Sequence, residues 1–325
     1  MLRTDINNDL YHGSEELSRS RASSLLSTSP AHVRQQMLNP YNPSTPALIM
    51  GGCFHTAVLE PMKLDEEFGE KPAEIDGYGP RTNAYKEAFK EMENEYANKQ
   101  WLNPSDFNTC MEMAGAALDN PILKDYMSDL DTIIEGTGYF DFEGADCKVR
   151  PDIYVPGAEV VIDLKSTQDA SEKGFARSVR KFGYDFQACW YLEGLKRMGY
   201  NPKTFIFVAV EKTPPYANAC YTLSAYDIAR QMEPMRRACR MWKECLDTDV
   251  WPGYADELKT LDLTNDWHRL SMQEVAKKFN VGRHFVYKIV EKYAIETKYI
   301  ANKRTVDLND FAMALKWDAE GKEVA

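Results

Sequence analysis

The sequence contains no hydrophobic run near the roughly 18 residues that a membrane span needs. The first ten residues are polar and include Asp5 and Asp9, which excludes a signal peptide. The seven cysteines include no CxxC pair, so their spacing fits no iron–sulfur cluster and favours free thiols in a reducing cytoplasm. Positive charge is also scarce, with a formal net charge of −11. We therefore expect a cytoplasmic protein with no membrane partner and no overall basic surface.

The residues present are those of a globular protein, 44% hydrophobic and 27% charged over 325 residues. Charge is unevenly distributed, because residues 267–317 hold ten Lys or Arg against five Asp or Glu. An acidic body remains compatible with DNA if its carboxylates hold divalent cations that meet the phosphates.

The pattern of elements predicts an α/β fold with a mixed sheet flanked by helices. Helices broken by Asn-Pro pairs precede three β-rich runs at Thr132–Phe142, Cys147–Val155 and Glu159–Ser166. A helical stretch with an interruption at Gly183 and the apolar strand Thr204–Glu211 follow. We divide the chain into a helical part (1–130), a core (131–250), a linker (251–266) and a small basic module (267–325).

Two acidic residues and a lysine are placed to converge in this core. Asp163 and Lys165 end the apolar run Val160–Ile162 and share one face of the strand, because side chains alternate. Asp152 lies at the end of the neighbouring strand, so hairpin pairing brings it beside Asp163. Two carboxylates suit Mg²⁺, with Mn²⁺ as an alternative, and Lys165 can orient water or neutralise charge on a phosphate. The alternative is a solvated Asp–Lys pair on a surface hairpin.

Several segments together resemble the RecE-type exonucleases (exonuclease VIII) of the PD-(D/E)xK nuclease superfamily. In order they are Ser29–His32, Gly51–Pro61, Glu135, Lys148–Asp152, Asp163–Thr167 and Tyr184–Gln187 leading to Tyr191. The resemblance spans about residues 18–246. It implies a PD-(D/E)xK restriction-endonuclease-like core in which Asp152, Asp163, His55 and the Leu164 carbonyl bind metal and Lys165 is catalytic.

The other candidate site residues each allow a functional and a structural interpretation. His55 lies in an apolar helix, where a core histidine is the alternative to the metal site that the resemblance implies. Glu135 either supports the site or is a surface carboxylate at a strand end. Gln187 and Tyr191 share a helix face at positions i and i+4 and either border the active site or fill the core.

The basic module resembles the winged helix-turn-helix modules of phage excisionases. Ser271 and Glu274 predict a capping box, and a turn at residues 280–282 precedes a second helix at Arg283–Tyr293. A hairpin at residues 298–306 and a helix at residues 308–315 complete it. The predicted DNA contacts are Arg283, His284, Tyr287, Lys288, Lys303 and Arg304. Oligomer contacts are the alternative role of this module.

The sequence thus predicts a Mg²⁺-dependent exonuclease that degrades one strand of linear duplex DNA. By resemblance the direction is 5′ to 3′, the 3′ strand passes to a single-strand annealing protein, the assembly is a ring, and the source is a phage or prophage in a bacterial host. Two other readings stay open. One is a site-directed endonuclease of the same superfamily, and the other is a non-catalytic DNA-binding protein on a nuclease scaffold.

Overall fold

The computed structural model describes residues 1–39, 45–254, 269–293, 295, 297–300 and 303–319. The chain divides into two compact units, the body (residues 1–254) and the C-terminal module (residues 255–325). Most of the linker predicted at 251–266 lies outside the described residues. In the described part of the chain, no helix is both long and apolar enough to cross a membrane.

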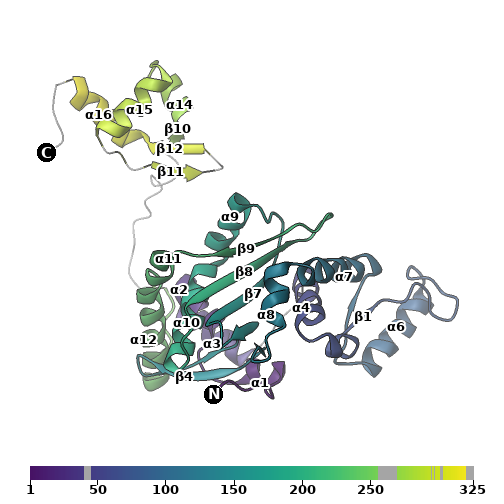
Figure 1. Ribbon diagram of the computed structural model, residues 1–325. Helices are drawn as coiled ribbons and strands as arrows, with labels where there is room; N and C mark the ends of the chain where they lie inside the picture. The colour runs from purple at the N-terminus through teal and green to yellow at the C-terminus, as the bar shows by residue number, and fades with distance from the viewer. Residues whose placement is uncertain (40–44, 255–268, 294, 296, 301–302, 320–325) are drawn as a thin grey trace. The chain divides into compact units, whose positions relative to one another are not determined.

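The body is built on a five-stranded mixed sheet, which confirms the predicted fold class (Figure 1). The strand order is β3 (Ile133–Ile134), β6 (Ile153–Val155), β7 (Val160–Thr167), β8 (Thr204–Glu211) and β9 (Asn218–Thr222). Only β7 and β8 are parallel; the other neighbours are antiparallel. The parallel pair requires a long crossover, which the two helices between β7 and β8 provide.

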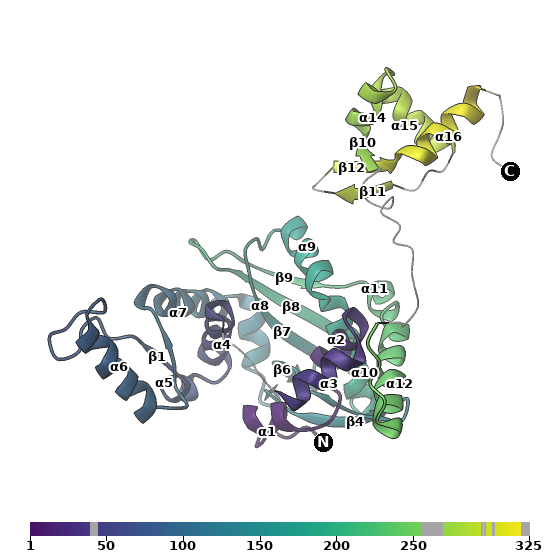
Figure 2. The same ribbon diagram turned by 180° about the vertical axis from the view of Figure 1, so that it is seen from behind.

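Helices cover both faces of the sheet. Successive residues of β7 point to opposite faces and pack in two different buried clusters. Ile162 and Leu164 pack with α4 (Pro46–Leu59), α7 (Pro104–Leu118) and α8 (Pro121–Met127). Val161 faces the other side, with α9 (Glu172–Phe182) and α10 (Tyr184–Arg197). Figure 2 shows this arrangement from behind. Gly183 separates α9 from α10 in a left-handed conformation (φ 64°), as predicted.

The predicted strand Thr132–Phe142 is wrong as a single element. It contains β3 and β4 (Gly138–Phe142), and β4 pairs only with β5 (Ala145–Val149) as a separate hairpin. The chain turns at Glu135, which has a left-handed φ of 51°. Likewise the run Cys147–Val155 divides into the end of β5 and β6, since Pro151 provides no backbone donor for a continuous strand.

The remaining elements of the body surround this core. The Asn-Pro pairs start α7 and α8, as the sequence predicts, and Pro30 and Pro46 also lie in the first turn of their helices. The other elements are α1 (Asn8–Gly13), α2 (Arg19–Ser27), α3 (Pro30–Leu38), η1 (Pro61–Lys63), α5 (Leu64–Glu67), β1 (Phe68–Glu70), α6 (Asn83–Glu95), β2 (Gln100–Leu102), α11 (Ala225–Ala229) and α12 (Met232–Thr248).

Two buried basic residues of the strand β5 and its extension hold the N-terminal segment against the body. The Lys148 ammonium donates to the Tyr11 carbonyl and to the carbonyl and hydroxyl of Ser14. Arg150 donates to Asn8 Oδ1 at 2.7 Å and to the Ile6 carbonyl at 2.8 Å. Both cations also lie over the Tyr11 ring. Burial lowers the pKa of Lys148 to about 8.

The C-terminal module contains β10 (Arg269–Ser271), α14 (Met272–Lys278), α15 (Arg283–Lys292), β11 (Thr297–Ile300), β12 (Lys303–Asp307) and α16 (Leu308–Ala319). The strands form one antiparallel sheet in the order β10–β12–β11. The capping box of Ser271 and Glu274 is confirmed. Its core includes Val275, Val286 and Phe311.

The residues predicted to contact DNA lie on α15 and β12. Arg283, His284 and Lys288 are exposed on α15, and Tyr287 is partly buried on the same helix. Lys303 and Arg304 begin β12, and their side chains fall outside the described part of the module. The role of this surface stays a prediction.

Candidate active site

Two aspartates meet just beyond the end of the β6–β7 ladder. Ile153 of β6 lies opposite Ile162 of β7, so the next antiparallel pair outward is Asp152 and Asp163. Asp152 precedes β6 and does not end a strand as predicted, but the register brings it to the expected partner. The Leu164 backbone N–H donates to Asp152 Oδ2 at 2.7 Å, and both aspartates are buried.

Lys165 and Gln187 contact the second of these aspartates. The Lys165 ammonium forms an ion pair with Asp163 Oδ2, and Gln187 Nε2 of α10 donates to Asp163 Oδ1 at 2.5 Å. Lys165 Nζ also lies 4.8 Å from the ring centroid of Tyr184. Tyr184 is not among the site residues predicted from the sequence. Its position three residues before Gln187 on the same helix face is the signal that would identify it.

His55 reaches the same cluster from α4. Its Nδ1 lies 3.4 Å from Asp152 Oδ2, and 31% of its side chain is exposed, so a ligand can approach it. Desolvation, followed by the positive charge of Lys165, lowers the pKa of His55 to about 4. The imidazole is therefore neutral at pH 7, the form that can bind a metal ion.

Glu135 lies just after β3, and its backbone N–H donates to the Asp152 carbonyl at 3.0 Å. Burial, and then the charge of Asp152, raise the pKa of its carboxyl group to about 8. Burial also raises the pKa of Asp163, to about 6, and that of Asp152. A left-handed backbone conformation and a desolvated carboxyl group at the same glutamate both cost stability. Backbone strain and shifted pKa values of this kind are typical of functional sites.

Tyr191 is the predicted site residue whose placement favours a structural role. Its ring packs 6.2 Å from the Phe205 ring and joins the clusters on either side of α10. Burial raises its pKa well above the ordinary value. Gln187 thus contacts the carboxylate cluster directly, whereas Tyr191 fills the adjacent core.

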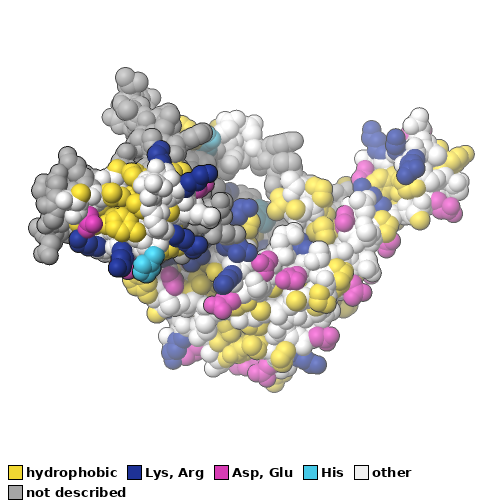
Figure 3. Space-filling model, turned by 90° about the horizontal axis from the view of Figure 1, so that it is seen from above, with side chains coloured by type: hydrophobic (Ala, Val, Ile, Leu, Met, Phe, Trp, Pro, Cys, Tyr) yellow, Lys and Arg dark blue, Asp and Glu magenta, His cyan; other side chains and the backbone are white. Residues whose placement is uncertain are grey.

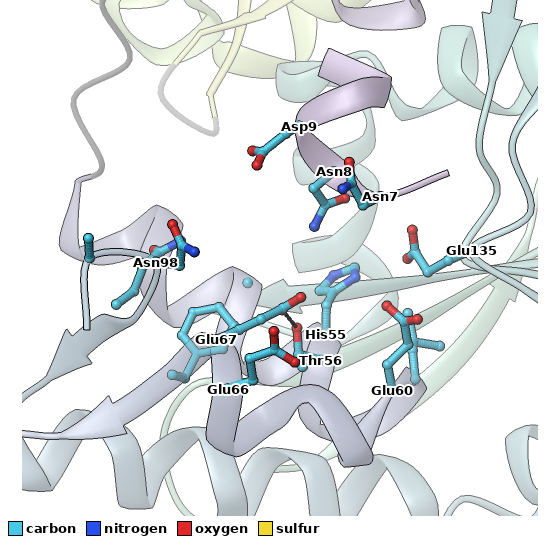
Figure 4. Close-up of a pocket in the computed structure, with 15 residues that line it drawn as sticks. Asn7, Asn8, Asp9, His55, Thr56, Glu60, Glu66, Glu67, Asn98 and Glu135 are labelled. Atoms are coloured by element: carbon cyan, nitrogen blue, oxygen red, sulfur yellow. Dashed lines mark hydrogen bonds between the residues drawn. The ribbon is translucent and has the colours of Figure 1, made fainter. Parts of the chain in front are cut away.

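A cavity of about 620 Å³ opens beside the cluster, with His55 and Glu135 in its wall (Figure 4). The described residues that line it include five carboxylates and no Lys or Arg: Asp9, Glu60, Glu66, Glu67 and Glu135. Asn7 and Asn8 of the N-terminal segment complete the opposite side. Such a wall repels a phosphate unless cations are present.

The atoms of the cluster that could bind a metal ion suit a hard divalent cation. Asp163 Oδ2 is buried, and the Lys165 ammonium contacts it. Asp152 Oδ2 and the neutral His55 imidazole are the other nearby groups that can bind a metal ion. Within the described ranges, no group of three His, Cys, Asp or Glu side chains is placed to hold a metal ion by itself. Mg²⁺ needs no closed site, because it keeps several waters and binds through one or two carboxylates.

Comparison with known proteins identifies a family that the sequence matches. The sequence matches the family described as "PDDEXK-like domain of unknown function (DUF3799)" over residues 18–264. No curated protein matches.

Two solved structures match this chain, and the first of them is similar in fold. A protein from Eubacterium rectale that carries the name "putative exonuclease" is 16% identical, with a TM-score of 0.55, over 82% of this chain and 97% of its own. A phage related exonuclease from Haemophilus somnus 129PT is 15% identical over 52% of this chain and 85% of its own, with a TM-score of 0.30. The match over residues 18–264 covers most of the chain, including every predicted site residue of the body, and so the protein belongs to the PDDEXK-like family DUF3799.

Proposed function

We propose that the protein is a Mg²⁺-dependent exodeoxyribonuclease that degrades one strand of linear duplex DNA in the 5′ to 3′ direction. The observation that carries the proposal is the convergence of Asp152, Asp163 and Lys165 where the β6–β7 ladder ends, beside a cavity with an acidic wall. This combination suits phosphodiester chemistry, because the carboxylates attract a cation and the cation admits the phosphate.

Each residue of the cluster has a distinct task in this reaction. Asp152, Asp163, the Leu164 carbonyl and His55 would hold the cation, which supplies Lewis-acid stabilisation of the phosphate and lowers the pKa of attacking water. Gln187 fixes one oxygen of Asp163 through its amide. The Lys165 ammonium lies where it can neutralise charge as water attacks phosphorus and the P–O bond to the neighbouring nucleotide breaks.

The C-terminal module would supply a second contact with DNA. Arg283, His284 and Lys288 are exposed on α15. In this proposal α15 serves as the second helix of a helix-turn-helix. In the same proposal, the remaining 3′ strand passes to a single-strand annealing protein in phage-type recombination, and ring-like assembly keeps the enzyme on its substrate. A site-directed endonuclease is the second candidate, favoured by the presence of this module in the same chain as the body.

End-labelled linear duplex and a covalently closed circle distinguish these candidates. With Mg²⁺ we expect mononucleotides from linear DNA, loss of the 5′ label before the 3′ label, and an intact circle. Without Mg²⁺ neither substrate should change. Discrete fragments from the circle would favour the endonuclease, and no hydrolysis of either substrate would contradict nuclease function.

Binding of Mg²⁺ should release protons at pH 7. Burial raises the pKa of Glu135 to about 8, so in the metal-free protein this carboxyl is mostly protonated at that pH. A cation nearby favours the ionised form and therefore displaces about one proton. The affinity for Mg²⁺ should accordingly rise with pH between about 6 and 8.

Isothermal titration calorimetry in two buffers of different ionisation enthalpy measures this release. The observed enthalpy at pH 7 should differ between the buffers in the wild-type protein and differ less in Glu135→Gln. An enthalpy that is independent of the buffer would show that no raised carboxyl group is coupled to the cation.

A further inference from the structure

The helix α9 carries a strip of positive charge on a chain whose net charge is −11. The four basic residues of this helix, Lys173, Arg177, Arg180 and Lys181, are all exposed. At 100° per residue they fall on one arc, opposite the buried Phe175 and Val179. We call this set of four the α9 strip. Figure 3 looks onto the side of the body on which α9 lies in Figure 1, where Lys and Arg side chains are among the exposed groups.

Most of this charge has no partner in the fold. Arg177 pairs with Asp169 at 3.0 Å. Within the described part of the body, Lys173, Arg180 and Lys181 form no ion pair, and Lys181 only lies over the Phe182 ring. Basic residues in the last turn favour the helix dipole, but Lys173 in the first turn opposes it, and like charges four residues apart repel. Helix stability therefore does not explain the strip.

The C-terminal end of the α9 strip adjoins the catalytic cluster. Gly183 turns the chain directly from α9 into Tyr184, whose ring contacts Lys165. Arg19 of α2 fixes this turn by donating to the Phe182 and Gly183 carbonyls, both at 3.1 Å. The strip thus leads along the surface from the cluster for the length of α9, about 16 Å.

We propose that the α9 strip binds the phosphate backbone of the DNA next to the scissile phosphate. This inference rests on the proposed nuclease function and adds the surface that holds its substrate. The cavity beside the cluster is acidic and cannot attract DNA by itself. One strand of a duplex carries about five phosphates along 16 Å of the axis, so a helix of this length with four cations matches the phosphates of one strand.

The test is DNA binding by the full chain in Ca²⁺, measured by fluorescence anisotropy with a short blunt-ended duplex at several salt concentrations. The triple variant Lys173→Ala/Arg180→Ala/Lys181→Ala should bind about tenfold or more weakly. The slope of log affinity against log salt should fall by up to about 2.7, the value for three lost phosphate contacts. Arg177 is left in place because it pairs with Asp169.

The matched control is Lys86→Ala/Lys90→Ala/Lys124→Ala, which removes the same charge from exposed positions on α6 and α8. The control should keep the wild-type slope and affinity within about twofold. Equal losses in both variants, or wild-type binding by the α9 variant, would overturn the proposed surface. If DNA binding depended on the α9 strip but the protein never cleaved DNA, the proposed DNA-binding surface would stand and the proposed nuclease function would be wrong.

Discussion

Replacing Asp163 by Asn should abolish Mg²⁺-dependent cleavage, with a loss of at least about 10³-fold in turnover. Asp163 is the buried carboxylate that faces Asp152, Lys165 and Gln187 together, so no other side chain can take its place. The amide removes the charge that attracts the cation but keeps an oxygen that can accept from Gln187. Nuclease assays and Mg²⁺ titration calorimetry on the same preparation should both show the loss.

The fold should survive this change, because asparagine nearly conserves the volume of the side chain and an amide avoids the cost of a buried charge. The matched control is Asp141→Asn, an exposed aspartate of β4 that should leave both activity and metal binding unchanged. Cleavage by a folded Asp163→Asn protein at the wild-type rate would reject this cluster as the active site.

Replacing Lys165 by Met should have the second largest effect, a loss of about 10²- to 10⁴-fold in turnover, while Mg²⁺ affinity is unchanged or higher. The ammonium pairs with Asp163 Oδ2, so it competes with a cation for that oxygen. Methionine keeps the length of the side chain and removes the charge. Turnover and metal binding should therefore change independently.

Single-turnover cleavage at saturating Mg²⁺, together with calorimetry, measures the two quantities separately. Lys203→Met is a matched control, because Lys203 also pairs with a carboxylate, Glu159, but outside the cluster. If Lys165→Met lost metal affinity and recovered its rate at high Mg²⁺, the lysine would be a positioning group for the cation and not a participant in the reaction.

The sequence predicts the sheet best where hydrophobicity is strongest. The run Val160–Ile162 before Asp163 identifies the central strand, and Gly183 identifies the break between two helices. The splitting of Thr132–Phe142 could not be predicted, because its cause is a left-handed backbone at Glu135, a residue that rarely adopts this conformation.

The candidate site could be predicted only where the sequence pattern itself brings its residues together. Strand periodicity places Asp163 and Lys165 together, whereas His55 comes from a distant helix and is reached only through the family resemblance. The burial of Lys148 has no signal in the sequence, since lysine in a β-hairpin is ordinarily exposed. Its three oxygen acceptors come from residues more than 130 positions away.

The attachment of the N-terminal segment by Lys148 and Arg150 has a consequence for handling the protein. Removing residues 1–14 would delete the acceptors of a buried ammonium and of a guanidinium, and unpaired buried charges are among the most costly defects in a fold. The same trimming would take away Asn7, Asn8 and Asp9, which line the acidic cavity. Shortened versions made for crystallisation or screening should therefore keep this segment.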